Sequence, residues 1–310
     1  MGRFHAGEQA LQARLHPALP ARMQQTAAMV IREFMPDQHR EFFALLPSLI
    51  IGSLDDAGRP WASMLSGLPG FILSPDPQTL HVAAKPIAGD PLGRHLTLDT
   101  QLGLLGLQPE TRRRNRMNGR VTALDGSGFT VTVEQSFGNC PQYIQARAPR
   151  LVAAPAAPPL RPESASLSPR AGAMLSQADT VFIATAAKDE GVDASHRGGR
   201  PGFLRVEQRD GATQLTLPDF RGNKFFNTLG NIALNPRAGL LVVDYATGDL
   251  LQLTAHAEII WDGPEVDSFA GAERLLRLNV ETGHIIEGGL PLRWSEPDYA
   301  PQLIATGSWT

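Results

Sequence analysis

The sequence predicts a mainly β fold with flanking helices, arranged as two tandem β-rich units. With 30 Gly and 25 Pro among its 310 residues, the chain is interrupted at the intervals typical of many short strands and turns. Apolar runs of strand length lie between these breaks, for example at 48–54 and 238–243. The two β-rich stretches also resemble each other in sequence, and 310 residues suffice for two domains with a core each.

Residues 1–35 predict a helical arm that packs across the two units. Its apolar face consists of Ala27, Met29, Val30, Ile31 and Phe34. His5, His16 and His39 fit no metal-binding spacing, so we expect surface or capping roles for them.

The first β-rich unit covers 36–147, with strands expected at 48–54, 61–65, 71–73 and 80–82. The arginine run at 112–116 suggests nucleic-acid binding, but it lacks interleaved aromatic residues and falls where a hairpin turn is expected. A solvated turn is the better interpretation.

Residues 148–169 contain six prolines and predict an extended linker. The second unit, 170–310, follows with a C-terminal extension. In that extension we expect a helix at 266–276 and a strand around 278–286. Arg274 and Arg293 would contact either a ligand or the first unit.

An internal repeat relates the two units. An offset of 132 positions lays LIIGS at Leu49 over VFIAT at Val181, and an offset of 136 lays Gly103 over Gly239. Identical pairs at the first offset include Ser63 and Ser195, Gly67 and Gly199, Pro69 and Pro201, Gly70 and Gly202, and Phe71 and Phe203. The repeat predicts an internal duplication, which in one chain mimics a two-fold dimer with a shared pocket.

The stretch 219–245 carries the main ligand-binding signal. Arg221, Asn223 and Lys224 surround Gly222 just before an apolar helical pattern that starts at Phe225, with Asn223 as the expected N-cap. A helix N-terminus with two cations nearby suits a phosphate, although a solvated cap has the same composition.

The first unit lacks this anion-binding chemistry. At the position of Arg221 to Lys224 it has Ala88-Gly89-Asp90-Pro91, and at the position of Ser195-His196-Arg197 it has Ser63-Met64-Leu65. We therefore expect one dominant phosphate site, in the second unit, and a degenerate first unit.

Composition narrows the function further. The net charge of −3 gives no indication of binding to nucleic acid or to anionic membranes. The single cysteine, Cys140, excludes an intramolecular disulfide and a multi-cysteine metal site, and no metal site is expected. No apolar run is long enough to span a membrane and no signal peptide is recognisable, so a cytoplasmic protein is expected.

The second unit resembles the pyridoxamine 5′-phosphate oxidase-like FMN-binding split-barrel superfamily. The resemblance rests on SHRGGRPGFLRV, LTLPDFRGNKFFNTLGNIALNPRAGLLVVDY and GDLLQLTAHAEI. The first unit, with DDAGRPWASMLSGLPGFI and FGNCPQYIQAR, resembles the partner half of a tandem-barrel branch. The resemblance implies a six-stranded antiparallel split barrel in each half, arranged as a pseudo-dimer.

The resemblance also implies a non-covalent FMN between the two barrels. The residues matched for binding it are Ser195, Arg197, Arg221, Asn223, Lys224 and Asn231. For Asn231 a hydrogen bond on the helix face is the alternative. No catalytic residue is identified.

Three residues are candidates for the chemistry. If 137–147 crosses toward the second barrel, it brings Asn139, Cys140, Gln142 and Tyr143 near the flavin ring. Tyr143 would then have a stacking or hydrogen-bonding role, and Cys140 a redox or substrate-facing role. A small buried residue is the alternative for Cys140. His196 is a candidate proton donor to the reduced flavin or the substrate; a histidine that supports the site from behind, or one at the surface, is the alternative.

The expected function is an FMN-dependent oxidoreductase with a small-molecule substrate and an electron donor such as NAD(P)H or a reductase. A non-catalytic flavin-binding or electron-carrier module is the alternative. A third hypothesis is a true pyridoxamine or pyridoxine 5′-phosphate oxidase. It is in doubt because no match to the C-terminal substrate-binding signature of those oxidases is found, and the chain ends in LPLRWSEPDYAPQLIATGSWT. A monomer and a homodimer both stay open.

Overall fold

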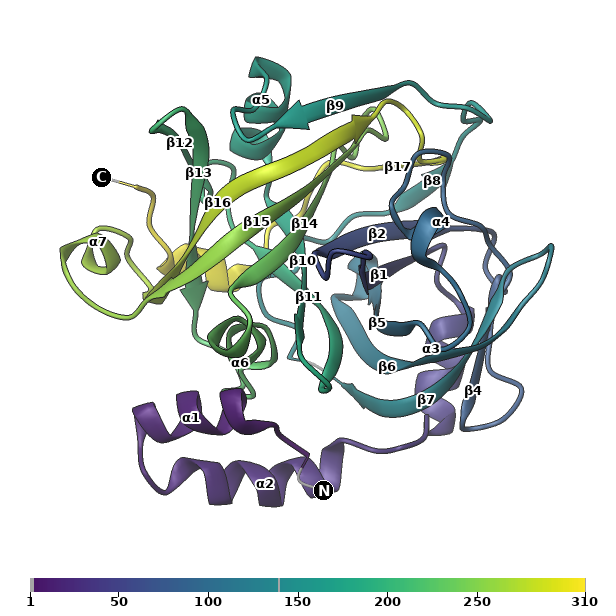
Figure 1. Cartoon of the computed structure of the whole chain (residues 1–310), viewed down its shortest axis with the longest axis horizontal. Helices are drawn as coiled ribbons and strands as arrows, with labels where there is room; N and C mark the ends of the chain where they lie inside the picture. Colours follow the sequence, from purple (N-terminus) through teal and green to yellow (C-terminus); the bar gives the residue numbers. More distant parts are fainter. Residues whose placement is uncertain (1–2, 139, 310) are drawn as a thin grey trace.

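The computed structural model describes residues 3–138 and 140–309, which form two large antiparallel sheets and an N-terminal helical arm (Figure 1). The predicted mainly β fold with flanking helices is therefore confirmed. The first sheet has the strand order β2-β1-β5-β6-β7-β4-β3. Its strands are β1 (Ser48–Leu54), β2 (Pro60–Ser66), β3 (Ile72–Leu73), β4 (Thr79–Val82), β5 (Gln101–Gln108), β6 (Arg113–Leu124) and β7 (Phe129–Gly138).

The second sheet has the order β11-β10-β14-β15-β16-β13-β12, and β9 (Leu160–Ser164) adds to β16. Its other strands are β10 (Thr180–Ala187), β11 (Gly191–Gly198), β12 (Arg205–Arg209), β13 (Ala212–Phe220), β14 (Arg237–Val243), β15 (Leu250–Ile260) and β16 (Ala272–Ile286). Each sheet has a path of seven strands where six were expected, because β3 and β12 extend it at one end.

The two sheets share strand order and register. Adding nine to each strand number in the order of the first sheet gives the strand order of the second sheet. The registers agree too: Leu49 faces Leu65 in the first sheet, and Val181 faces Arg197 in the second, both at the offset of 132 found in the sequence.

The arm consists of α1 (Ala6–Leu15) and α2 (Leu19–Val30), which lie side by side below the second sheet in Figure 1, with α1 next to α6 (Asn227–Leu234). His5 is the N-cap of α1 and completes a capping box with Glu8, as expected for a capping histidine. The remaining helices are α3 (Asp37–Ala44), α4 (Leu92–His95), α5 (Pro169–Gln177) and α7 (Pro264–Asp267).

Each half has an apolar core of its own, and a third apolar cluster joins them. Two glycines at equivalent positions permit this approach. A Cβ on Gly103 would lie 2.4 Å from the carbonyl oxygen of Val192, and a Cβ on Gly239 would lie 2.4 Å from that of Pro60. The backbones of the two halves therefore touch where no side chain fits, in a pseudo-two-fold arrangement.

Two elements differ from expectation. The linker 148–169 is extended but contributes two short strands, β8 (Pro149–Leu151), which pairs with β17 (Leu292–Trp294), and β9. The prediction of a helix at 266–276 is wrong. Only α7 is helical there, and β16 begins at Ala272, because Leu276, Leu278 and Val280 alternate inward with the period of a strand.

Candidate functional site

A cleft of about 120 Å³ lies at the N-terminus of α6, where the two halves meet. Both halves line it. From the second half come Ser195, His196, Arg197, Gly198, Pro218, Asp219, Phe220, Arg221, Gly222, Asn223, Lys224, Phe226, Asn227, Thr228, Leu229, Glu273 and Arg274, and from the first Leu105, Arg114, Arg116, Cys140, Gln142 and Tyr143.

The loop 221–226 enters α6 by a route that the sequence did not predict. The N-cap is Phe226, not Asn223, and the helix begins at Asn227. Asn223 instead accepts a hydrogen bond from the Phe225 N–H at 3.1 Å, closing a tight turn. Lys224 and Phe226 both have positive φ, of 62° and 64°, a conformation that non-glycine residues adopt only when surrounding contacts hold them in it.

The start of α6 retains free hydrogen-bond donors. Among the described residues, no acceptor is recorded for the backbone N–H groups of Thr228 and Leu229, as is usual in the first turn of a helix. Both residues line the cleft, so the positive end of the helix dipole is directed at it.

Two arginines of the first half reach into this cleft. Arg114 and Arg116 lie on β6, two residues apart and so on one face of the strand. The solvated turn expected for this run is wrong for both of them, because β6 already begins at Arg113. Arg116 is 6% exposed, donates to the Ser195 hydroxyl and pairs with Asp193 at 3.4 Å. Burial lowers the pKa of both guanidinium groups, that of Arg114 to about 9. Arginine side chains keep their proton in proteins, so both are cations at neutral pH.

Hydroxyl groups and carboxylates hold several of the cations in place. The Ser195 hydroxyl, buried beside Arg116, lies 2.7 Å from that of Thr228. Asp219 accepts from Arg197 and, at 2.7 Å, from Arg274. One carboxylate therefore fixes two guanidinium groups at the cleft.

Arg221 and Lys224 are exposed, and no ion pair or side-chain hydrogen bond is recorded for either of them within the described part of the chain. In all, six cationic side chains line the cleft against two carboxylates, those of Asp219 and Glu273. The cleft thus carries an excess of positive charge in a chain whose net charge is −3.

His196 is a neutral imidazole in this setting. Burial, together with the nearby Arg114 and Arg197, lowers its pKa well below the usual range. Arg114 Nη1 lies 3.0 Å from His196 Nδ1 and can only donate, so the imidazole proton is on Nε2. Nε2 is buried without a partner among the described residues, which leaves it free to donate to a ligand.

The segment after β7 crosses to the second half, as the sequence suggested. Cys140, Gln142 and Tyr143 line the cleft, whereas Asn139 lies outside the described residues. Tyr143 packs against Phe220 with ring centroids 5.0 Å apart, and burial raises the pKa of its hydroxyl. Cys140 is half-buried and lines the cleft, rather than lying in a core.

Asn231, also proposed from the sequence to bind the cofactor, does not line the cleft. It is buried one turn further along α6, and its amide donates to Asp193 at 2.9 Å and to Thr185 at 3.2 Å. This position matches the helix-face hydrogen bond that was the alternative. Arg293 likewise lies away from the cleft and donates to the carbonyl groups of Leu290 and Leu292.

The equivalent place in the first half is filled by the chain itself. Ser63, the counterpart of Ser195, donates to the buried carboxylate of Asp90 at 2.6 Å. Gln252, the counterpart of Arg116 at the offset of 136, donates to the same carboxylate at 3.1 Å. Burial raises the pKa of Asp90 to about 6. An internal carboxylate thus satisfies the donors that an anion would need.

Among the described residues, no group of three or more His, Cys, Asp or Glu side chains is arranged to hold a metal ion. No helix there is long and apolar enough to cross a membrane.

Part of the second half matches a known protein family. The model of the family described as pyridoxamine 5′-phosphate oxidase matches residues 167–286. No curated protein matches the chain.

Several solved structures are similar over about two fifths of the chain. HupZ of Group A Streptococcus is 14% identical, with 40% of this chain and 98% of that chain covered at a TM-score of 0.32. A putative pyridoxamine 5′-phosphate oxidase of Lactobacillus delbrueckii is 16% identical, with 39% and 94% covered at 0.31. HutZ of Vibrio cholerae, described as a heme storage protein, is 14% identical, with 40% and 96% covered at 0.28.

Proposed function

Because residues 167–286 form a domain of the pyridoxamine 5′-phosphate oxidase-like split-barrel superfamily, we propose that the cleft binds FMN without a covalent bond and that the protein is an FMN-dependent oxidoreductase. The observation that carries the proposal is the set of unsatisfied donors at the cleft. Arg221 and Lys224 have no carboxylate partner among the described residues, and the start of α6 directs free N–H groups at the same space.

The residues present fit a phosphate monoester. A phosphate dianion accepts several charge-assisted hydrogen bonds, and helix N-termini with nearby cations are common seats for it. Arg221, Lys224 and the N–H groups of Thr228 and Leu229 would hold the phosphate. Tyr143 and Phe226, which also line the cleft, would contact the flavin ring.

Buried donors in the cleft support a planar, polar ring as well. The Nε atoms of Arg114, Arg116 and Arg274 and the Nε2 atom of His196 have no partner among the described residues. Buried polar groups are usually hydrogen-bonded, so unsatisfied donors that line one cleft suggest a ligand rich in acceptors.

Bound FMN would supply the hydride or electron transfer, while the protein supplies binding and orientation. His196 would donate a hydrogen bond from Nε2 as a neutral imidazole, and its lowered pKa argues against a role as a cationic acid. Tyr143, whose pKa is raised, would keep its proton and donate through its hydroxyl. The cations of both halves would stabilise negative charge on a bound ligand.

We also infer that the two halves arose by internal duplication. Their common strand order, their common register and the equivalent glycines at their contact support this inference. The Asp90 carboxylate then explains why one of two equivalent places would have lost its ligand.

Titration of the purified, flavin-free chain with FMN tests the proposal. Arg221→Ala combined with Lys224→Ala removes two charge-assisted contacts of about 1.5 kcal/mol or more each, so Kd should rise about a hundredfold. The matched control is Arg209→Ala with Lys188→Ala, which removes an equal charge from exposed positions of the same half away from the cleft.

Unchanged FMN affinity in the Arg221 and Lys224 variant would place the flavin elsewhere. A wild-type chain that takes up no FMN, or that shows a heme spectrum as purified, would overturn the proposal. Reduction of the bound flavin by NADH, NADPH or a reductase, followed by reoxidation, distinguishes an enzyme from a flavin carrier.

A further inference from the structure

The N-terminal arm contacts the cleft-lining loop at three positions close together. Gln12 Nε2 donates to the carbonyl oxygen of Lys224 at 3.3 Å. The ring of Phe225 packs edge-on against Phe4, with centroids 5.2 Å apart. The amide of Asn227 donates to the Glu8 carboxyl at 2.5 Å. Within the four residues 224–227, contacts from α1 and the segment before it thus hold one backbone carbonyl, one aromatic ring and one side-chain amide.

The helix pair is packed closely enough to make these contacts specific. A Cβ on Gly7 would lie 2.2 Å from the Gly230 carbonyl oxygen, and a Cβ on Gly230 would lie 2.6 Å from Glu8 Cγ. The backbones of α1 and α6 therefore cross in direct contact. Glu8, 3% exposed, is confined between the arm and the start of α6.

The loop needs such support. Lys224 and Phe226 both have left-handed backbone conformations, which non-glycine residues keep only where surrounding contacts hold them. The three arm contacts fall on Lys224, on Phe225 between the two strained positions, and on Asn227 directly after the second.

We propose that the N-terminal arm is a positioning element of the anion cleft, in which Glu8 and Gln12 hold the loop 224–227 in its ligand-binding conformation, so that docking of the arm and binding of the ligand strengthen each other. The inference rests on the proposed FMN site. Such coupling is reciprocal: what the arm adds to ligand affinity, the ligand adds to arm docking.

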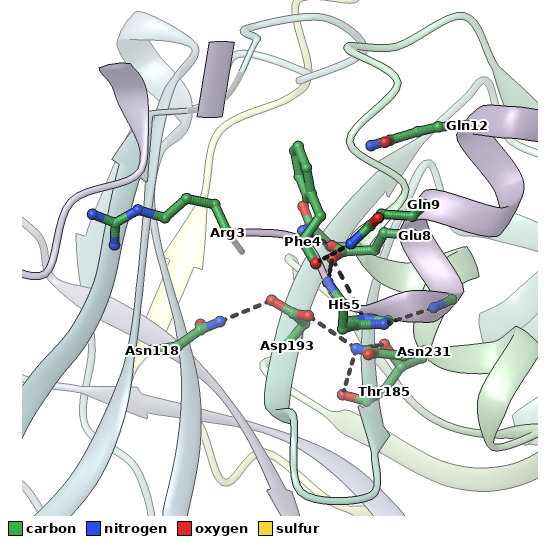
Figure 2. Close-up of polar contacts among 12 residues, drawn as sticks. Arg3, Phe4, His5, Glu8, Gln9, Gln12, Asn118, Thr185, Asp193 and Asn231 are labelled. Atoms are coloured by element: carbon green, nitrogen blue, oxygen red, sulfur yellow. Dashed lines mark hydrogen bonds and ion pairs between the residues drawn. The ribbon is translucent and has the colours of Figure 1, made fainter. Parts of the chain in front are cut away.

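The charge state of Glu8 adds a pH dependence. In Figure 2 the segment from Phe4 to Glu8 lies next to Asp193, whose carboxylate receives hydrogen bonds from Asn118 and Asn231. Burial and the Asp193 charge raise the pKa of Glu8 to about 8, against the opposing effects of the His5 N–H, the Asn227 amide and the Arg116 cation. The His5 imidazole also faces this carboxyl, with Nε2 3.6 Å from Oε2.

Glu8 is therefore neutral at pH 7 and becomes an anion above pH 8. That second anion would lie against the same helix N-terminus as the phosphate. The affinity for a phosphate ligand should accordingly fall as the pH rises through 8.

FMN titrations of the full-length chain test the inference. Glu8→Ala should raise Kd about tenfold, the effect of one lost hydrogen bond that holds the site. Glu8→Gln, which keeps an amide able to pair with Asn227, should stay within about threefold of wild type by the same reasoning. Glu33→Ala is the control, because Glu33 is an exposed glutamate of the arm region that pairs with Arg3 and does not line the cleft.

Two readouts separate positioning from general stability. The affinity of the wild type should fall above pH 8, whereas that of Glu8→Gln should not follow this transition. FMN should also slow amide hydrogen exchange in 6–15, the residues of α1, and leave α3 unaffected.

The outcomes distinguish the two proposals. If wild type binds FMN and Glu8→Ala binds it equally tightly with unchanged exchange at 224–230, the arm has no positioning role, while the FMN site stands. Identical pH profiles for wild type and Glu8→Gln would also overturn the role of Glu8. A wild-type chain that binds no FMN overturns both proposals.

Discussion

Arg116→Gln tests whether the first half contributes to the ligand site of the second. Arg116 lies on β6 of the first half, yet its guanidinium contacts Ser195 and Asp193 of β11. Its counterpart at the offset of 136 is Gln252, which lies at the equivalent place that the Asp90 carboxylate fills. The substitution therefore puts into the cleft the residue type found at that filled place. The side chain becomes shorter but stays polar, and the positive charge is lost.

Two separate effects should follow. Removing one partner of a buried ion pair costs about 3–5 kcal/mol, and the lower end applies here because Asp193 keeps Asn118 and Asn231 as donors. In a protein of this size, that corresponds to a fall in Tm of roughly 5 °C. Loss of one charge-assisted contact to the ligand, about 1.5–3 kcal/mol, should raise the Kd for FMN by about 10- to 150-fold.

Quenching of flavin fluorescence on binding gives Kd, and thermal unfolding of the same samples gives Tm. Arg113→Gln is the matched control, because Arg113 is exposed on the same strand, lies over the ring of Phe42 and does not line the cleft. An Arg116→Gln chain that is folded and binds FMN within twofold of wild type would refute the contribution of the first half.

Two further predictions concern the contact between the halves. Gly103→Ala should lower the free energy of unfolding, measured in urea, by about 1–3 kcal/mol or more, because its Cβ would lie 2.4 Å from the Val192 carbonyl oxygen. Gly126→Ala is the control and should be nearly neutral, because a Cβ there meets open space. Equal stabilities of the two variants would contradict the close contact at Gly103. Burial lowers the pKa of His284 to about 4. Between pH 4 and 6.5 this histidine therefore binds fewer protons in the folded chain than in the unfolded chain. The free energy of unfolding should accordingly fall as the pH drops through that window. The effect is at most about 3 kcal/mol, and His284→Gln should flatten that part of the profile; an unchanged slope would show that other groups cause it.

Much of the fold could be predicted from local patterns. Glycine and proline breaks, short apolar runs and the internal repeat indicated two β-rich halves, and the offset of 132 in the sequence is the offset between the registers of β1 and β10. The helix expected at 266–276 failed because short apolar runs satisfy helical and strand periods alike. The inward alternation of β16 is decisive only once its partner strands are known.

The cleft could be predicted only in its local part. The residues of 221–224, together with Ser195 and Arg197, were identified because they are close in sequence to a helix start or to a repeat difference. Arg114 and Arg116 were missed because the run was assigned to a turn. Two signals were available: their spacing of two residues, which suits one face of a strand, and the alignment of Arg116 with Gln252 at the offset of 136.

The contacts between the arm and the loop before α6 could not be predicted from local sequence patterns. Glu8 and Asn227 are separated by 219 positions, and nothing in either stretch indicates the other. The left-handed conformation of Phe226 was equally unexpected, because an aromatic residue in an apolar helical pattern predicts a helix interior, whereas packing of Phe225 against Phe4 and Phe137 fixes the turn before it.

The stoichiometry of FMN binding tests the central claim most directly, because the claim is that both halves build one anion cleft and that the Asp90 carboxylate fills the equivalent place. Titration of a known concentration of flavin-free chain, followed by isothermal calorimetry, should saturate at one FMN per chain. Saturation at two FMN per chain, or no binding at all, would contradict the account.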